Sequence, residues 1–140
     1  MKKQIFIGEY ETVLDCDSGF EIPTAYLKLL RAGATTRRHA IIACLDALRV
    51  YPEQTFSEYV DELRENLRKT KSPSETDIAS NQLRSLTASA HTIKWDENGR
   101  IALSEKLVMF ADITPGDRIR LRGIYSYFEI TAARGPCGHS

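Results

Sequence analysis

The chain has 140 residues, of which 42% are hydrophobic and 27% charged, and its 19 basic and 19 acidic side chains give a formal net charge of zero. This composition is typical of one ordinary globular domain or two very small ones, and it excludes collagen-like, disordered and membrane-spanning chains. A neutral chain also lacks the basic excess that nucleic-acid-binding proteins usually carry, so any positive surface must be local or be assembled from several copies.

The start of the chain and its cysteines predict a cytoplasmic protein without cofactors. MKKQIFIGEYE has two lysines but no apolar h-region and no cleavage site, so we expect no secretory signal. Cys16, Cys44 and Cys137 are widely spaced without a C-x-x-C pair, which is typical of reduced thiols. Cys137 and His139 near the end would make a poor metal site, because two ligands do not complete a coordination shell.

The first part of the chain predicts a strand, a turn, a second strand and a short helix. The first strand lies within residues 5–14, the turn is DCDSG, and the alternation in FEI indicates a half-buried strand that Pro23 ends. The helix TAYLKLL follows, with Thr24 as its N-cap. After the loop RAGATTRR, AIIACLDALRVY predicts two more strands at 41–45 and 48–51.

The middle of the chain predicts two consecutive helices. The first spans about 54–70 and opens with the capping-box pattern T-x-x-E at Thr55 and Glu58. The second spans about 73–87, with Ser72 as its N-cap and proline at its first position. Apolar residues of the first helix fall on one stripe: Phe56, Tyr59, Val60, Leu63 and Leu67.

The last third of the chain repeats the pattern of the first. TIKWDENGRIALSEKL aligns with ETVLDCDSGFEIPTAY, so that Asp96 lies over Asp15 while Arg100 lies over Gly19. The second copy is predicted to contain the same kinds of element in the same order. These are a strand at 89–95, the turn DENG, the strand RIAL, the helix SEKLVMFA with a serine cap, the turn TPGD and the strands RIRLRGI and YFEIT.

These patterns divide the chain into a first repeat at 5–53, a two-helix insert at 54–87, a second repeat at 88–133 and a tail at 134–140. Each repeat is marginal in size for a core of its own. We therefore expect the two repeats to share one barrel-like core around an internal pseudo-two-fold axis.

Five segments resemble the MraZ family in order and spacing, over about residues 5–131. FIGEYETVLDCDSGFEIPTAYLKLL resembles its opening, F-R-G followed by L-D-x-K-G-R and a proline, and LRVYPEQTFSEYVDEL resembles its L-x-x-Y-P strand and following helix. SPSETDIASNQL resembles its second linking helix, DENGRIALSEKLVMFADI its second D-x-x-x-R copy, and IRLRGIYSYFEI its closing strands.

The resemblance implies an α+β fold with two AbrB-like swapped-hairpin β half-barrels in one chain, sharing a pseudo-two-fold core, with a helical hairpin insert between them. It implies a cytoplasmic, nucleoid-associated transcriptional regulator that assembles into a homo-oligomeric ring. Its partner would be double-stranded DNA, at direct repeats upstream of a cell-division and cell-wall gene cluster. The sequence offers no nucleophile–base–orienter set, no phosphate-binding glycine loop and no zinc-ligand spacing, so we expect no catalysis, no cofactor and no small-molecule substrate. We also expect no contact with a membrane, because no apolar run approaches the length that spans a bilayer.

The chain departs from the family where the family carries its cations. The three cationic positions of the first family copy are occupied here by Ile7, Asp17 and Gly19. In the second copy the motif arginine is present as Arg100, but Asn98 stands at the lysine position. Because phosphate neutralisation supplies much of the affinity for DNA, these replacements predict a weakened first contact site.

Candidate DNA-binding residues are therefore Arg100, helped by Lys2, Lys3, Arg37 and Arg38. An arginine suits bidentate contact with phosphate or guanine. The alternative is that Arg100 pairs with a turn carboxylate of its own copy and braces the loop.

Three residues are predicted to shape the two turns. Asp15 and Asp96 can each accept backbone N–H bonds two residues on, and Gly99 can adopt a positive φ that sets the guanidinium of Arg100 at the hairpin edge. In the alternative interpretation, in which Arg100 braces its own loop, its partner is the carboxylate of Asp96.

A second group of arginines, Arg118, Arg120 and Arg122, alternates along a predicted strand and so lies on one face. The row could follow a phosphate backbone, pair with acidic residues of a neighbouring subunit, or be solvated. Two functions remain open at this stage. One is a DNA-binding ring, and the other is an oligomeric interaction protein whose DNA binding is weakened or lost because the first motif lacks its cations.

Overall fold

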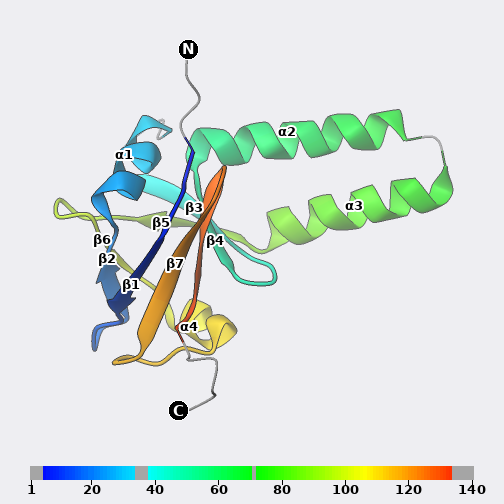
Figure 1. The fold of residues 1–140 in the computed structure, drawn as a ribbon. Coiled ribbons are helices and arrows are strands. Elements are labelled where there is room, and N and C mark those ends of the chain that lie inside the picture. Colours follow the sequence, from blue (N-terminus) through cyan, green and yellow to red (C-terminus); the bar gives the residue numbers. More distant parts are fainter. Residues whose placement is uncertain (1–4, 34–37, 71, 134–140) are drawn as a thin grey trace.

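The computed structural model describes residues 5–33, 38–70 and 72–133 (Figure 1). The described elements, in chain order, are β1 (Glu9–Val13), β2 (Gly19–Glu21), α1 (Thr24–Ala32), β3 (His39–Cys44), β4 (Leu48–Pro52), α2 (Glu53–Lys69), α3 (Pro73–Ala88), β5 (Ala90–Lys94), β6 (Arg100–Ala102), α4 (Glu105–Ala111), β7 (Arg118–Ile124) and β8 (Tyr127–Ala132). The order strand–strand–helix–strand–strand therefore occurs twice, with two helices between, and the predicted α+β class is confirmed.

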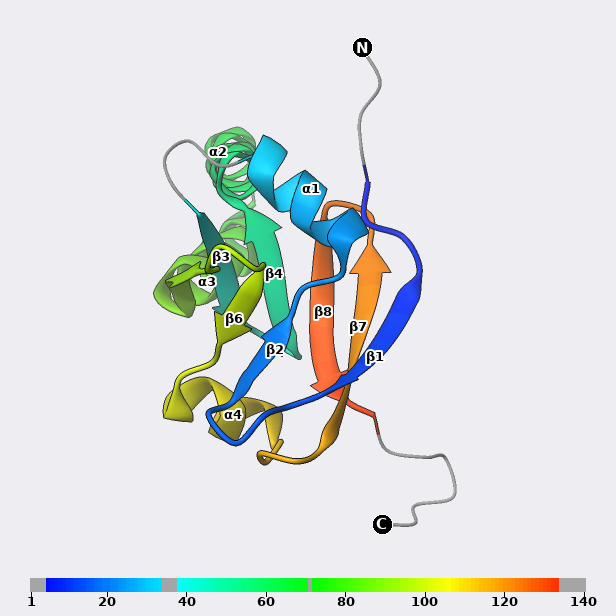
Figure 2. The ribbon, with the colours of Figure 1, turned by 90° about the vertical axis from the view of Figure 1, so that its left-hand side faces the viewer.

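Strands of the two copies are interleaved in one sheet, so that neither copy forms a sheet of its own. The larger sheet has the order β1-β7-β8-β4-β3-β5, and β2 pairs with β6 in a separate antiparallel ribbon (Figure 2). Exchanging β1 with β5, β7 with β3 and β8 with β4 turns this order into its own reverse. The topology is thus symmetric between the two copies, and four of the strand pairs join one copy to the other.

One hydrophobic core fills the space that these strands enclose. It takes large buried side chains from both copies, including Phe20, Tyr26, Trp95 and Phe128. Phe20 and Ile101 face each other at the middle of the β2–β6 pair and are 1% and 0% exposed. The helices α1 and α4 lie at opposite ends of the strands (Figure 2).

The helices α2 and α3 form an antiparallel arm that projects from the sheet (Figure 1). Only the base of the arm packs on the strands, in a second cluster built on Ala43, Tyr51, Leu63 and Leu86. Ser72 caps α3 as predicted, since its hydroxyl accepts the backbone N–H of Glu75 at 3.1 Å. No helix within the described ranges is both long and apolar enough to span a bilayer.

Two predicted N-caps are wrong, and proline is the reason in both. α2 begins at Glu53, directly after Pro52 at the end of β4, so Thr55 lies inside the helix and forms no capping box. α1 begins at Thr24 itself, after Pro23. Each proline holds φ near the helical value, −59° and −54°, so the chain enters the helix without a polar cap. Ser104, by contrast, caps α4.

Replacing Phe20 by Ala should lower the free energy of unfolding by about 3–5 kcal/mol, because it opens a cavity at the centre of the shared core. Urea denaturation followed by circular dichroism measures this change. Ile78→Ala, at a side chain that is 62% exposed, is the control and should change the free energy by less than about 0.5 kcal/mol. Separate transitions for the two copies, with only one shifted by Phe20→Ala, would contradict a single core.

Candidate nucleic-acid interface

The two copies of the D-x-x-x motif form turns with equivalent backbone hydrogen bonds. In the first turn the N–H of Asp15 donates to the carbonyl of Gly19 at 2.9 Å, and in the second the N–H of Asp96 donates to the carbonyl of Arg100 at 3.0 Å. The residue at the fourth position is left-handed in both, with φ of 61° at Ser18 and 78° at Gly99. The repeat seen in the sequence is thus also a repeat of backbone geometry.

The turns lie next to each other because the β2–β6 pair joins them. The N–H of Ile22 donates to the carbonyl of Gly99 at 2.8 Å, and the N–H of Leu103 donates to that of Ser18 at 2.8 Å. Each turn is therefore anchored on the strand end of the other copy. Both turns therefore lie at one place on the molecule.

The aspartates that open the turns have different partners. The carboxylate of Asp96 accepts the backbone N–H groups of Asn98 at 2.8 Å and Arg100 at 3.0 Å, which is the predicted turn-forming role. The bond from the N–H of Arg100, more than that from Asn98, lowers the pKa of Asp96 below its ordinary value. The carboxylate of Asp15 instead contacts a guanidinium group.

That guanidinium belongs to Arg100, whose side chain crosses to the first turn. It forms ion pairs with Asp15 and Asp17, the second at 2.5 Å, and it is 28% exposed. The hydrogen bond to Asp15 is the largest cause of the raised pKa of Arg100. Arg100 thus braces the turns as the alternative interpretation supposed, but its side chain pairs with carboxylates of the other copy rather than with Asp96.

Gly19 makes room for this arrangement. A Cβ atom at position 19 would lie 2.5 Å from one terminal nitrogen of Arg100 and 2.8 Å from its Cζ. Real Cβ atoms do not approach other heavy atoms so closely, and the guanidinium could not stay where it is. The guanidinium of Arg100 can therefore occupy this place only because residue 19 has no side chain.

The other predicted cations are only partly within the described residues. Lys2, Lys3 and Arg37 lie outside them. Arg38 is exposed just before β3, and its carbonyl accepts the N–H of Trp95 at 3.0 Å beside the second turn. Its charge is also among the causes that lower the pKa of Asp96, so Arg38 is close enough to add positive potential there.

The arginine row on β7 pairs within the chain, which none of the three sequence-based alternatives included. Arg118 contacts Glu11 at 3.7 Å, Arg120 contacts both Glu9 and Glu11, and Arg122 contacts Glu9 at 3.4 Å. The signal was present in the sequence, because Glu9 and Glu11 alternate with the same period on β1, which pairs with β7. Such exposed pairs add little stability, but the two glutamates offset most of the positive charge of the three arginines.

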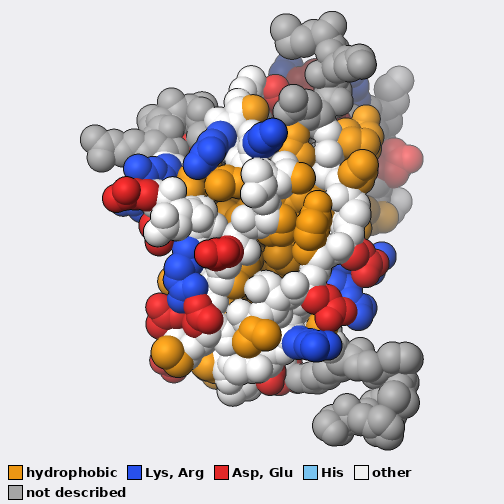
Figure 3. Space-filling view, turned by 60° about the vertical axis from the view of Figure 1, so that its left-hand side comes forward, with side chains coloured by type: hydrophobic (Ala, Val, Ile, Leu, Met, Phe, Trp, Pro, Cys, Tyr) orange, Lys and Arg blue, Asp and Glu red, His pale blue; other side chains and the backbone are white. Residues whose placement is uncertain are grey.

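Positive charge does not accumulate on the face shown in Figure 3. Lysine and arginine side chains alternate there with acidic ones around an apolar patch. This agrees with the zero net charge of the chain. Ile7 is 66% exposed and adds a further apolar group to the surface.

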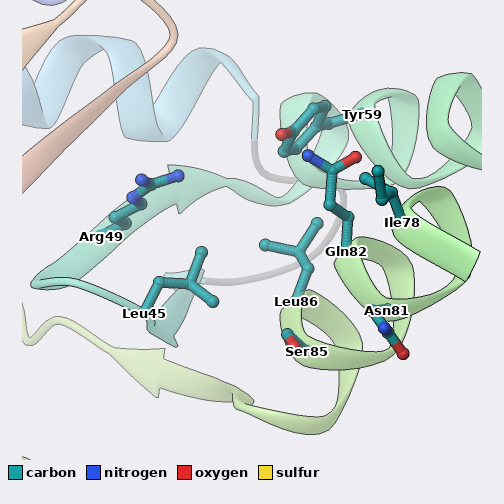
Figure 4. A pocket seen from close by; sticks show the side chains of 8 residues that line it. All are labelled: Leu45, Arg49, Tyr59, Ile78, Asn81, Gln82, Ser85 and Leu86. Atoms are coloured by element: carbon teal, nitrogen blue, oxygen red, sulfur yellow. The ribbon is translucent and has the colours of Figure 1, made fainter. Parts of the chain in front are cut away.

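A separate cavity of about 530 Å³ lies between the α2–α3 arm and the β3–β4 turn (Figure 4). Its walls are mixed, with Arg49, Asn81 and Gln82 among apolar side chains. None of the residues that line this cavity belongs to either turn. Cys16 and Cys44 are free thiols, and within the described ranges no three His, Cys, Asp or Glu side chains cluster to hold a metal ion.

Comparison with known proteins decides the family. A transcriptional regulator MraZ from Bacteroides thetaiotaomicron is 30% identical over 130 residues, which cover 91% of this chain and 78% of that protein. The chain belongs to the MraZ family. The transcriptional regulator MraZ of Bacteroides fragilis is 28% identical over 132 residues, covering 91% of this chain and 77% of its own length. No protein-family model matches the chain.

The left-handed residue of each turn yields a matched pair of substitutions. Ser18→Gly should raise the free energy of unfolding by about 1 kcal/mol, because it relieves a side chain from positive φ. Gly99→Ser should lower it by about 1 kcal/mol or more, because it introduces that strain and places a Cβ 2.7 Å from Leu27. Thermal or urea denaturation of both variants measures the changes, and equal signs would contradict the equivalence of the turns.

Asp96→Ala should lower the melting temperature at pH 7 and should lose its effect in acid. The pKa of Asp96 is lowered in the folded state, so its contribution is complete above the ordinary Asp value of about 3.9 and disappears as the pH falls through the lowered folded pKa. Melting curves of both proteins between pH 7 and pH 2 test this. Glu97→Ala, at the exposed neighbouring carboxylate, is the control, and a pH-independent difference for Asp96→Ala would refute the assignment.

Proposed function

We propose that this protein is a sequence-specific DNA-binding transcriptional regulator that acts as a ring-shaped homo-oligomer. Its target would be direct repeats upstream of a cell-division and cell-wall gene cluster, in the cytoplasm and on the nucleoid. The observation that carries the proposal is the similarity to MraZ transcriptional regulators over 91% of the chain.

The arrangement of the strands supports the finer parts of the proposal. The symmetric order β1-β7-β8-β4-β3-β5 and the cross-paired β2 and β6 are what two degenerate AbrB-like swapped-hairpin halves would produce. Such a unit would present its two turns together, and the turns 15–19 and 96–100 do lie together. In this proposal they are the DNA-contacting loops, with Arg100 as the principal cation and Arg38 beside it.

Assembly would compensate for the weakness of one protomer. A neutral chain with one motif arginine can make few phosphate contacts, and each contact contributes modestly to affinity. Several protomers in a ring would contact repeated sites at once, so that the second and later contacts become intramolecular. This makes a repeated DNA site the natural partner of a weakly charged subunit.

A second function is favoured by one specific observation. Arg100 is paired with Asp15 and Asp17, and the β7 arginines are paired with Glu9 and Glu11. A chain in which these four arginines are paired internally would suit an oligomeric interaction protein that retains the family fold but has weakened or lost DNA binding. The two functions make opposite predictions about salt.

The test is a salt titration of binding to direct-repeat duplexes from the upstream region of the gene cluster, after light scattering has established the oligomer. The DNA-binding function predicts that affinity falls steeply with salt, and that Arg100→Ala weakens binding and reduces the slope of log K against log salt by about 1 for each contact. Fluorescence anisotropy measures both quantities.

Arg68→Ala is the matched control, because it removes an exposed arginine from the far part of α2, paired there with Glu65. It should leave both affinity and slope nearly unchanged. Binding that is negligible at low salt for the assembled protein would refute the DNA-binding function and favour the interaction protein. If Arg68→Ala and Arg100→Ala weaken binding equally, Arg100 makes no specific contact with DNA.

A further inference from the structure

We propose that the carboxylates of Asp15 and Asp17 compete with DNA phosphate for Arg100, so that the first turn limits the affinity of the second. This inference rests on the proposed DNA-binding function, which it deepens. It makes the affinity of this chain for DNA a property of two acidic residues that do not themselves contact DNA. The geometry of the paired turns carries it.

The first turn offers Arg100 the same chemistry that a phosphate group offers. An arginine guanidinium presents parallel N–H groups that match a pair of anionic oxygens, whether these belong to carboxylates or to phosphate. Here one terminal nitrogen faces Asp15 and the other faces Asp17. Both terminal nitrogens are thus already paired with carboxylates within the chain.

Glycine at position 19 holds the guanidinium in this place. The side chain of Arg100 lies across the backbone of Gly19, where a Cβ atom would come within 2.5 Å of its terminal nitrogen. Gly19 is itself buried beneath it. Any larger residue at position 19 would move Arg100 away from its two carboxylates and toward solvent.

The charge balance at the turns opposes an approaching phosphate. Two carboxylates around one guanidinium leave the cluster with a net negative charge. To bind Arg100, a phosphate must break its ion pairs with both carboxylates. An exposed ion pair of this kind corresponds to about threefold in an equilibrium constant, so removing one carboxylate charge should raise affinity about threefold and removing both about tenfold.

The experiment measures binding of the intact oligomer to the direct-repeat duplex for Asp17→Asn and for the double variant Asp15→Asn/Asp17→Asn. For each pair of turns that contacts DNA, we expect affinity at low salt to rise about threefold in Asp17→Asn and about tenfold in the double variant. Adding Arg100→Ala to the double variant should abolish the gain. Asp61→Asn, which removes one exposed negative charge from α2, is the matched control and should change affinity less than twofold.

A second measurement reports on the pairing without DNA. The Nε–H signal of Arg100 in a nitrogen–proton NMR spectrum should shift in Asp15→Asn/Asp17→Asn and also in Gly19→Ala, in which a Cβ displaces the guanidinium. Thermal melting of each variant shows whether it remains folded. Because asparagine keeps the size of aspartate and one side-chain acceptor oxygen, the Asn variants should remain folded.

The outcomes separate this inference from the function on which it rests. Wild-type binding that the Asn substitutions do not strengthen overturns the inference and leaves the function intact. A gain that survives Arg100→Ala also overturns it, because the carboxylates would then act as general negative charge. No binding by wild type or by the double variant refutes both, whereas binding that appears only in the double variant supports the inference.

Discussion

The structure depends on the fact that neither repeat can enclose a hydrophobic core alone. Each repeat supplies only a few short strands and one short helix, and burial of their apolar faces requires the strands of the other repeat. The β2–β6 pair is the clearest result, since Phe20 from one repeat packs against Ile101 from the other at its centre. Every other feature of the site follows from this interleaving, because it brings the two turns into contact.

Interleaving also explains how the backbone can stay symmetric while the chemistry does not. The hydrogen bonds that define the turns are the same in both copies, so the fold tolerates different side chains on them. The first turn carries Asp17 and Gly19, and Arg100 of the second turn finds an internal carboxylate partner there. Asp17 and Gly19 thus leave the first turn without a cation, and Asp17 also pairs with the arginine of the second turn.

The local structure was predictable from the sequence where side-chain spacing alone determines it. The alternating strands, the serine-capped helices α3 and α4 and the helical stripe of α2 were all predicted, because each depends on residues a few positions apart. The starts of α1 and α2 were each placed one residue too late, and Thr55, the predicted cap of α2, lies three residues after the observed N-cap Pro52. There the prolines Pro23 and Pro52 set the backbone, and the nearby threonines that looked like caps became ordinary helical residues.

The sequence by itself determined the repeat, the order of elements, the family and the residues that could carry a function. Only the tertiary structure decided which charges meet: Arg100 pairs with Asp15, 85 positions away, and the β7 arginines pair with the β1 glutamates. The physical reason is that local patterns encode local conformation, whereas ion-pair partners depend on the register between segments distant in the chain. That register is set by burial of the shared core, which no single segment contains.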